Sequence, residues 1–265
     1  MLKNDLDKTF ASLKNKKRKA LIAYLAAGYP GLKEEKNIIK AMVEEGVDVL
    51  EVGIPFSDPI ADGPTIQFAS QEALKKGVTV SKILRWISEL KREIPVPIVA
   101  MTYINPVLAY GTDKFARDAA RAGVSGVIIP DLIPEESDAI RRQLASKKIH
   151  LIHLVAPTTP VARQKSIARK TGGFLYAVSV AGVTGARRAL PTKTKAWLNQ
   201  LGSISKNPVC VGFGISGPQQ VRHLRDAVSG FIVGSAFIDL LRKYKSGQRV
   251  AAMRRFVRAL SKECL

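Results

Sequence analysis

Eight short apolar runs alternate with helix-length amphipathic stretches along this 265-residue chain. The runs are rich in Val, Ile, Leu and Ala, end at Gly, Pro, Asn or Asp, and cover residues 21–27, 47–52, 96–102, 124–129, 150–155, 174–179, 209–212 and 231–233. Nearly continuous apolar strands that alternate with helices are typical of a parallel sheet buried on both faces. Because eight such units in about 250 residues have the size of one barrel, the pattern predicts an α/β fold, a single (β/α)8 TIM barrel.

The stretches between the runs have the length and apolar spacing of helices. We predict helices over residues 34–45, 81–92, 112–122, 135–145, 159–170, 192–201 and 218–228, and a basic outer helix over 242–258. An extra N-terminal helix near residues 5–13 is expected to cap the bottom of the barrel. No Gly/Ser-rich or Pro-rich linker interrupts the alternation, so residues 1–265 are expected to form one domain. A doubly wound open sheet is the alternative, although its G-x-G-x-x-G signature is missing after residues 21–27.

The formal net charge of +20 is concentrated in the second half of the chain. Residues 1–140 carry 19 Lys and Arg against 19 Asp and Glu, whereas residues 141–265 carry 23 against 3. Such an excess suggests a nucleic acid, an acidic partner or an anionic substrate, but charge runs usually lie on solvated helix faces. Because few aromatic residues stand near these bases, we expect no nucleic-acid partner and interpret the basic half as solvated surface that weakly steers a phosphorylated substrate.

The two cysteines and the hydropathy pattern point to a cytoplasmic protein. Cys210 and Cys264 provide neither a disulfide framework nor the spacing of a metal site, which favours a reducing compartment. No segment approaches the roughly 18 consecutive apolar residues of a membrane helix, and the N-terminus lacks a signal-peptide core. We therefore expect no membrane contact.

Glu51 stands inside the second apolar run, in the sequence DVLEVG at residues 48–53. A side-chain period of two places Glu51 on the same face as Val49, in an otherwise apolar strand. An ionised carboxylate in such a place costs several kcal/mol unless it is paired, so its pKa should rise toward neutrality, as a general acid/base requires. A structural glutamate held by a salt bridge is the alternative, although the run contains no Lys or Arg.

The loop directly after this strand carries two further carboxylates, Asp58 and Asp62, in the sequence IPFSDPIADGPT at residues 54–65. Either aspartate alone is interpreted as a turn former, because Asp before Pro or Gly commonly is one. The loop nevertheless follows the strand end at once, where the active sites of such barrels lie. It therefore brings a second carboxylate near Glu51, and two carboxylates in different environments can divide acid and base roles.

Glycine-rich segments end three later strands. The segments VGFGIS at 211–216 and IVGSA at 232–236 stand where such barrels form a phosphate cradle from backbone N–H groups. The segment SVAGVTGARRALP at 179–191 is typical of a lid, with Thr184 able to meet a carboxylate on closure, and an ordinary long loop is its alternative.

The absence of certain residue types from the apolar runs disfavours several chemistries. No strand core contains Lys, so a Schiff-base aldolase has no obvious amine. His150 and His153 are expected on opposite faces of one strand and His223 on a helix, so we expect no metal site. Acid–base chemistry on a phosphorylated small molecule remains.

Three motifs closely resemble the tryptophan synthase α-chain family. They are LEVGIPFSDPIADGPTIQ at 50–67, GVTGAR at 182–187 and GFGIS at 212–216, and the resemblance extends from AAGYP at 26–30 to Gly234 and Ser235. It implies the lyase reaction of tryptophan biosynthesis, retro-aldol cleavage of indole-3-glycerol phosphate to indole and glyceraldehyde 3-phosphate.

The resemblance also implies roles for individual residues. Glu51 would protonate indole C3 and accept the glycerol hydroxyl proton, Asp62 would stabilise the positive indole nitrogen, and Tyr176 would be an active-site tyrosine. The substrate-binding residues implied are Tyr24, Met101, Tyr103, Ile128 and Phe213 around the indole, Gly185, Gly214, Gly234 and Ser235 around the phosphate, and Thr184 in the lid, anchored by Asp131.

The family resemblance implies a partner as well. It implies no cofactor in this chain, because pyridoxal phosphate belongs to a β chain that joins the α chain in an α2β2 tetramer and receives indole through a tunnel. The contact residues implied are Pro55, Asp58, Pro59, Asn105 and Pro106. Relatives are commonly neutral to acidic, so the charge of +20 leaves two alternatives, a β chain with an acidic face or release of free indole. A related barrel with another substrate and a nucleic-acid-binding barrel remain competing hypotheses.

Overall fold

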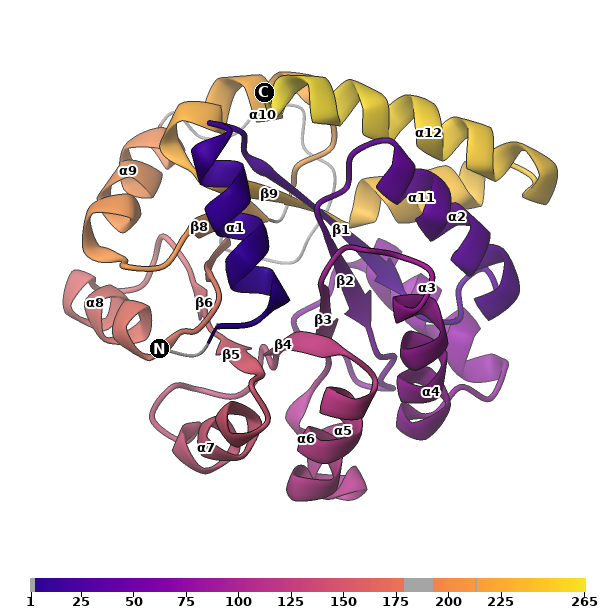
Figure 1. Cartoon of the computed structure of the whole chain (residues 1–265), viewed down its shortest axis with the longest axis horizontal. Helices are drawn as coiled ribbons and strands as arrows, with labels where there is room; N and C mark the ends of the chain where they lie inside the picture. Colours follow the sequence, from indigo (N-terminus) through magenta and orange to yellow (C-terminus); the bar gives the residue numbers. More distant parts are fainter. Residues whose placement is uncertain (1–2, 179–192, 213) are drawn as a thin grey trace.

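Parallel strands form the centre of the structure, and helices surround them (Figure 1). The computed structural model describes residues 3–178, 193–212 and 214–265. The strands are β1 (Ala20–Ala26), β2 (Val49–Gly53), β3 (Ile98–Met101), β4 (Val124–Ile128), β5 (His150–Ile152), β6 (Leu154–Val155), β7 (Leu175–Val178), β8 (Val209–Gly212) and β9 (Gly230–Val233). Their order in the sheet is β5-β4-β3-β2-β1-β9-β8-β7-β6. The predicted TIM barrel is confirmed.

The fifth apolar run, predicted as one strand, is divided at His153. Within residues 3–178, 193–212 and 214–265, its first part, β5, pairs only with β4, and its second part, β6, pairs only with β7. The backbone N–H of His153 donates to the Thr171 hydroxyl at 3.0 Å and not to a neighbouring strand. The two ends of the sheet are therefore consecutive in the chain, and the barrel closes through this interrupted strand.

The helices lie near the predicted positions, with shifted ends. They are α1 (Asp5–Asn15), α2 (Leu32–Glu44), α3 (Pro64–Lys75), α4 (Val80–Lys91), α5 (Ile104–Tyr110), α6 (Thr112–Arg121), α7 (Asp138–Ser146), α8 (Val161–Lys170), α9 (Thr194–Ile204), α10 (Pro218–Leu224), a 3-10 turn η1 (Arg225–Ala227), α11 (Ser235–Lys243) and α12 (Ser246–Glu263). Helices α3 and α5 were not predicted from the sequence. No helix in the described part of the chain combines the length and apolar character that crossing a membrane requires.

The basic helix predicted over 242–258 is two helices. Helix α11 ends at Lys243 and α12 begins at Ser246. The Arg249 guanidinium donates to the carbonyl oxygens of Leu241 and Tyr244 at 2.8 and 2.9 Å, so it satisfies carbonyls that the end of α11 leaves without helical partners. This contact between residues on both sides of the corner explains the break.

The arginines of α12 pair with glutamates of α2. Arg249 lies 3.1 Å from Glu34, and Arg258 lies 2.8 Å from Glu45, which also pairs with Arg254. These arginines lower the pKa of Glu45 to about 2. The interpretation of this segment as solvated surface is therefore only partly correct, because acids of the first half balance some of the bases of the second half.

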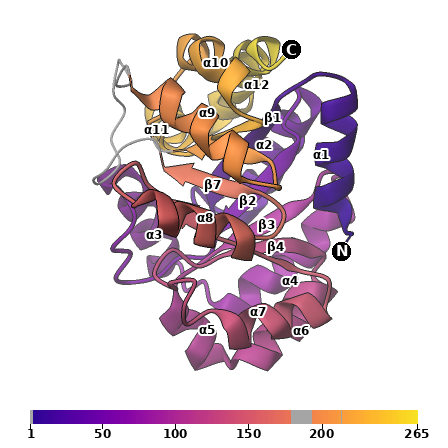
Figure 2. The same ribbon diagram turned by 90° about the vertical axis from the view of Figure 1, so that its left-hand side faces the viewer.

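Helix α1 lies across the amino ends of the strands, as Figures 1 and 2 show. The Asn4 side chain caps α1 by accepting from the N–H of Leu6 at 2.9 Å, and it donates to the carbonyl oxygens of Ser125 and Lys148 at 2.7 and 2.9 Å. Asp7 accepts from the Asn4 N–H and lies 2.8 Å from His150 Nε2. These contacts fasten the predicted N-terminal helix to β4, β5 and the end of α7.

Candidate active site

Glu51 lies in the middle of β2, inside the barrel. It stands opposite Tyr24 of β1 and Val99 of β3 in the parallel ladder, and it is 1% exposed. Its Oε2 atom has no hydrogen-bond partner among the described residues. Burial raises the pKa of Glu51 to about 8, and the negative charge of Asp62 adds to this rise. Within the described chain no Lys or Arg forms an ion pair with Glu51, so the salt-bridge alternative has no support.

Asp62 is held by the loop between β2 and α3. Its N–H donates to the carbonyl of Pro59 at 3.0 Å, and its carbonyl accepts from Gln67 at 2.9 Å. Burial raises the pKa of Asp62 to about 6, and a hydrogen bond from the Tyr103 hydroxyl opposes this rise. Two neighbouring carboxyls therefore differ in protonation near neutral pH, with Glu51 holding a proton and Asp62 ionised.

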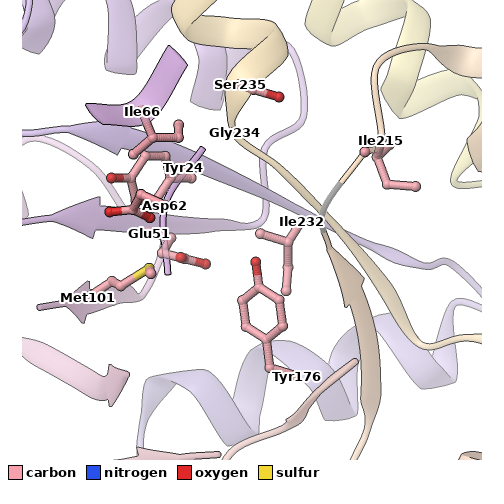
Figure 3. Close-up of a pocket in the computed structure, with 11 residues that line it drawn as sticks. Tyr24, Glu51, Asp62, Ile66, Met101, Tyr176, Ile215, Ile232, Gly234 and Ser235 are labelled. Atoms are coloured by element: carbon pink, nitrogen blue, oxygen red, sulfur yellow. The ribbon is translucent and has the colours of Figure 1, made fainter. Parts of the chain in front are cut away.

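A pocket opens at the carboxyl ends of the strands beside these two groups. Its lining residues are Tyr24, Glu51, Asp62, Ile66, Met101, Tyr176, Gly214, Ile215, Ile232, Gly234 and Ser235. In Figure 3 the side chains of Glu51 and Asp62 lie next to each other, and the Tyr176 hydroxyl points toward Glu51. Burial raises the pKa of both Tyr24 and Tyr176 well above its usual range, so each phenol stays neutral and can donate a hydrogen bond.

Two glycines at strand ends make room for these tyrosines. A Cβ atom at Gly53 would collide with the Tyr24 hydroxyl, and one at Gly212 would lie 2.5 Å from the Tyr176 hydroxyl. Both positions therefore require glycine for space, while neither has the positive φ that strains other residues. The tyrosines consequently lie against the backbone of the neighbouring strand and reach the pocket.

The far wall of the pocket is formed by Gly214 and by the start of α11. Gly214 has a φ of +88°, a conformation that favours glycine. The Gln220 side chain braces this turn by accepting from the N–H of Ser216 and Gly217 at 2.6 and 3.1 Å and donating to the Gly214 carbonyl at 2.8 Å. Gly234 and Ser235 begin α11, where N–H groups without helical partners and the helix dipole favour an anion.

Three predicted substrate and lid residues lie near the pocket without lining it. Tyr103 accepts from the Ala61 N–H at 3.1 Å and so supports the loop that holds Asp62. Ile128 stands opposite Met101 in the ladder and is fully buried. Asp131 accepts from the Ile104 N–H at 2.9 Å. The other three predicted residues, Thr184, Gly185 and Phe213, lie outside the described residues.

The five predicted partner-contact residues do not share one environment. Asp58 and Asn105 are exposed and Pro106 is half-buried, whereas Pro55 and Pro59 are buried within the chain and support the loop from inside. Two apolar residues near them, which the sequence analysis did not single out, are also exposed. Ile60 is 77% and Leu108 is 56% exposed. Asn105, Pro106 and Leu108 lie in helix α5, where the sequence predicted a loop, and the exposed surface of this helix and of the loop before α3 is partly apolar.

The histidines lie away from this pocket. His150 contacts Asp7, and the buried His153, whose pKa burial lowers to about 4, lies 3.5 Å from the Ser137 hydroxyl. In the described ranges no three His, Cys, Asp or Glu side chains are grouped in a way that could hold a metal ion.

Four residues of the site were missed from the sequence. Ile66, Ile215 and Ile232 line the pocket, and Gln220 braces the turn at Gly214. Ile232 had a usable signal, because it stands two residues before Gly234 and therefore on the same face of its strand. Gln220 had none, since its partners are backbone groups of an irregular turn.

Known proteins are similar to this chain over almost its whole length. The family model described as Tryptophan synthase alpha chain matches residues 10–263. The tryptophan synthase alpha chain of Carboxydothermus hydrogenoformans is 44% identical over 239 residues, 90% of each chain. That of Citrifermentans bemidjiense is 42% identical over 256 residues, 97% of this chain and 96% of the relative. The solved structure of tryptophan synthase subunit alpha from Legionella pneumophila superposes with a TM-score of 0.90 at 33% identity, covering 99% of this chain and 98% of that chain. The range matched by the family model includes every residue that lines the pocket.

Proposed function

The chain belongs to the tryptophan synthase alpha chain family, which cleaves indole-3-glycerol phosphate to indole and glyceraldehyde 3-phosphate, and on that premise we propose how its residues divide the reaction. It is a lyase of tryptophan biosynthesis, and its family implies a β-chain partner. The observation that carries the proposal is the pair Glu51 and Asp62, two buried carboxyls in one pocket with separated pKa values.

Glu51 is the acid and the base of this proposal. As a neutral carboxyl it donates its proton to C3 of the indole ring, which places a positive charge on the ring nitrogen. The resulting carboxylate then accepts the proton of the hydroxyl group on the carbon attached to C3. The bond between that carbon and C3 breaks, its electron pair returns to the ring, and the hydroxyl carbon becomes the aldehyde. The proton returned to Glu51 completes the cycle.

Asp62 stabilises the charge that develops between these two proton transfers. An ionised carboxylate opposes the positive ring nitrogen, and in a pocket shielded from water this attraction is stronger than in solution. The hydrogen bond from Tyr103 and the rigid loop support this role, because a preorganised group needs no rearrangement during the reaction. Tyr176, kept neutral by burial, is assigned to donate a hydrogen bond to the substrate.

The phosphate group is assigned to the wall opposite Met101. Backbone N–H groups at Gly214, Gly234 and Ser235 offer donors there, and the start of α11 favours an anion. Tyr24, Met101, Tyr103, Ile128 and Phe213 are assigned to the indole ring. Thr184 and Gly185 are assigned to a lid over the phosphate, with Asp131 as the anchor of Thr184.

The β chain is assigned to the loop that carries Asp58 and to helix α5, which carries Asn105. The exposed Ile60 and Leu108 of these two segments support this assignment, because apolar side chains gain by leaving water. We expect an α2β2 tetramer in the cytoplasm, with pyridoxal phosphate bound by the β chain and none by this chain.

Indole formation from indole-3-glycerol phosphate tests the proposal, with and without an added β chain. We expect activity from the wild-type chain and a loss of at least ~10²-fold in Glu51→Gln, the usual size of an acid–base contribution. Glu35→Gln is the matched control, because Glu35 is also 1% exposed with a raised pKa but accepts from the Gly28 N–H outside the pocket. Its activity should stay within a few-fold of the wild type. Wild-type turnover in Glu51→Gln would remove Glu51 from the mechanism.

A further inference from the structure

A groove of about 760 Å³ lies at the amino end of the barrel, since residues directly before β1 and β9 and at the start of β8 line it. One wall is α1 with the loop that leads to β1, and the other wall is the end of α9 with the loop that leads to β8. The start of β8 and the turn before β9 form its floor. The proposed reaction uses no residue of this groove.

Basic side chains outnumber acidic ones in the lining of this groove. Lys14, Lys17 and Lys19 come from the α1 wall and Lys206 from the α9 wall. Arg18 also lines the groove, but it is paired with Asp48. The four lysines have no carboxylate within 4 Å in the described chain, and the undescribed segments contain no Asp or Glu.

The two acidic residues of the lining are engaged elsewhere. Asp7 accepts from the Asn4 N–H and contacts His150. Asp226 lies 3.7 Å from Lys195 and 3.9 Å from Arg225. The concave surface therefore has a net positive charge. The low-dielectric protein walls of a cleft concentrate the electric field of such charges. Lys19 is half-buried directly before β1, whereas Lys14, Lys17 and Lys206 are exposed.

We propose that this groove binds a small anion that carries several linked phosphate groups. Lysines stand on both walls of the groove, so an anion with several linked phosphate groups can present oxygens to Lys206 and to the lysines after α1 together. Charge-assisted hydrogen bonds from ammonium groups to phosphate oxygens supply the attraction. A free inorganic triphosphate and the triphosphate of a nucleotide share this chemistry.

Lys17 offers a clean way to remove one of these charges. It follows α1 with a φ of 54°, and the N–H groups of Lys17 and Arg18 donate to the carbonyls of Lys14 and Leu13 at 3.0 and 2.9 Å, a helix end that favours glycine. Lys17→Gly therefore removes the ammonium group and relieves backbone strain at the same time. A folding defect is not expected in this variant.

Lys148 is the matched control. It has a φ of 61° at the same kind of helix end, after α7, and it is exposed outside the groove. Lys148→Gly therefore makes the same change of residue, charge and backbone strain elsewhere on the molecule. Any difference in anion affinity between the two variants is therefore due to the position of Lys17 in the groove.

Calorimetric titration of the full-length chain with inorganic triphosphate at low salt tests the proposal, with ATP in a second arm and glycerol 3-phosphate present to occupy the active site. We expect saturable binding at one site, weakened about fivefold or more by Lys17→Gly and less than twofold by Lys148→Gly. Equal affinities in the two arms indicate recognition of the triphosphate alone, and tighter binding of ATP indicates a nucleotide ligand.

Three results would overturn the proposal. They are an absence of saturable binding, equal weakening by both variants, and displacement of triphosphate by glycerol 3-phosphate, which would assign the binding to the pocket of Glu51. Equally tight binding of a single-stranded oligonucleotide, with the same dependence on Lys17, would also overturn it. That result would identify the groove as part of a nucleic-acid-binding surface. Loss of indole formation in the wild type would leave this test unaffected.

Discussion

At the carboxyl ends of the strands the barrel buries Glu51 and Asp62 without a cation, whereas at the amino ends four lysines line a groove and have no carboxylate within 4 Å in the described chain. The difference lies in solvation. A buried carboxyl that lacks a partner responds by a raised pKa, so it becomes able to exchange a proton near neutral pH. The lysines of the open groove face solvent and can attract an anionic ligand. Groups without a partner of opposite charge therefore indicate chemistry at one end and binding at the other.

The amino end also contains polar groups that are fully satisfied. Asn4 makes hydrogen bonds to the backbone of α1, to β4 and to the end of α7, and Asp7 joins Asn4 to His150. These groups stabilise the position of α1. By contrast, Glu51 Oε2 has no partner in the described chain. Satisfied groups should thus affect stability, and the unsatisfied carboxyl that lines the pocket should affect catalysis.

Asp62→Asn should have the largest effect. Loss of the negative charge opposite the indole nitrogen should lower the rate of indole formation at least ~10²-fold at pH 7. Asp58→Asn is the control in the same loop, because Asp58 is exposed and its activity without a β chain should stay within a few-fold of the wild type. Steady-state rates of both variants check this prediction, and equal rates would show that the buried aspartate has no electrostatic role.

Glu51→Gln should stabilise the fold at high pH although it removes activity. The pKa of Glu51 is about 8 in the folded chain, above the value of 4.5 expected for an exposed carboxyl. The unfolded chain therefore binds fewer protons between these values, so the stability that Glu51 contributes is full below pH 4.5 and is lost as the pH rises through 8. Glutamine does not ionise, so the variant does not lose this stability. At pH 8 its free energy of unfolding should be about 1–3 kcal/mol higher than that of the wild type.

Urea unfolding at pH 5 and pH 8 measures this gain. The gain should be larger at pH 8 than at pH 5. The exposed residue Glu136 provides the control, because Glu136→Gln should change stability equally at both pH values. A variant at Glu51 that is less stable than the wild type at pH 8 would mean that the ionised carboxylate has a partner.

Asn4→Ala should have the smallest effect of the three changes. The loss of a helix cap and of two hydrogen bonds to the barrel should lower the free energy of unfolding by about 1–2 kcal/mol, with kcat unchanged. Asn15→Ala is the control at the exposed end of α1 and should stay within about 0.5 kcal/mol of the wild type. A lower kcat without a loss of stability would contradict the separation of the two ends.

The residues that could be predicted share one property, a position set by the local chain. Glu51 follows from the period of two in its strand, and Asp62 from the loop that must follow that strand. Ile66 and Gln220 could not be predicted, because their contacts with the pocket and with the turn at Gly214 depend on how the elements pack. The division of the fifth strand was missed for the same reason. The Thr171 hydroxyl, 18 residues further along the chain, accepts the hydrogen bond from the His153 N–H.

The sequence by itself determined the alternation of apolar strands with helices, the place of Glu51 in an apolar strand and the family of the chain. Periodicity and chain connectivity are local properties, so they are readable without coordinates. Only the tertiary structure decided which charges have partners. The glutamates of α2 meet the arginines of α12 about 210 residues later, whereas the lysines around the groove meet none in the described chain. Electrostatic energy depends on distance in space, and the fold alone sets that distance.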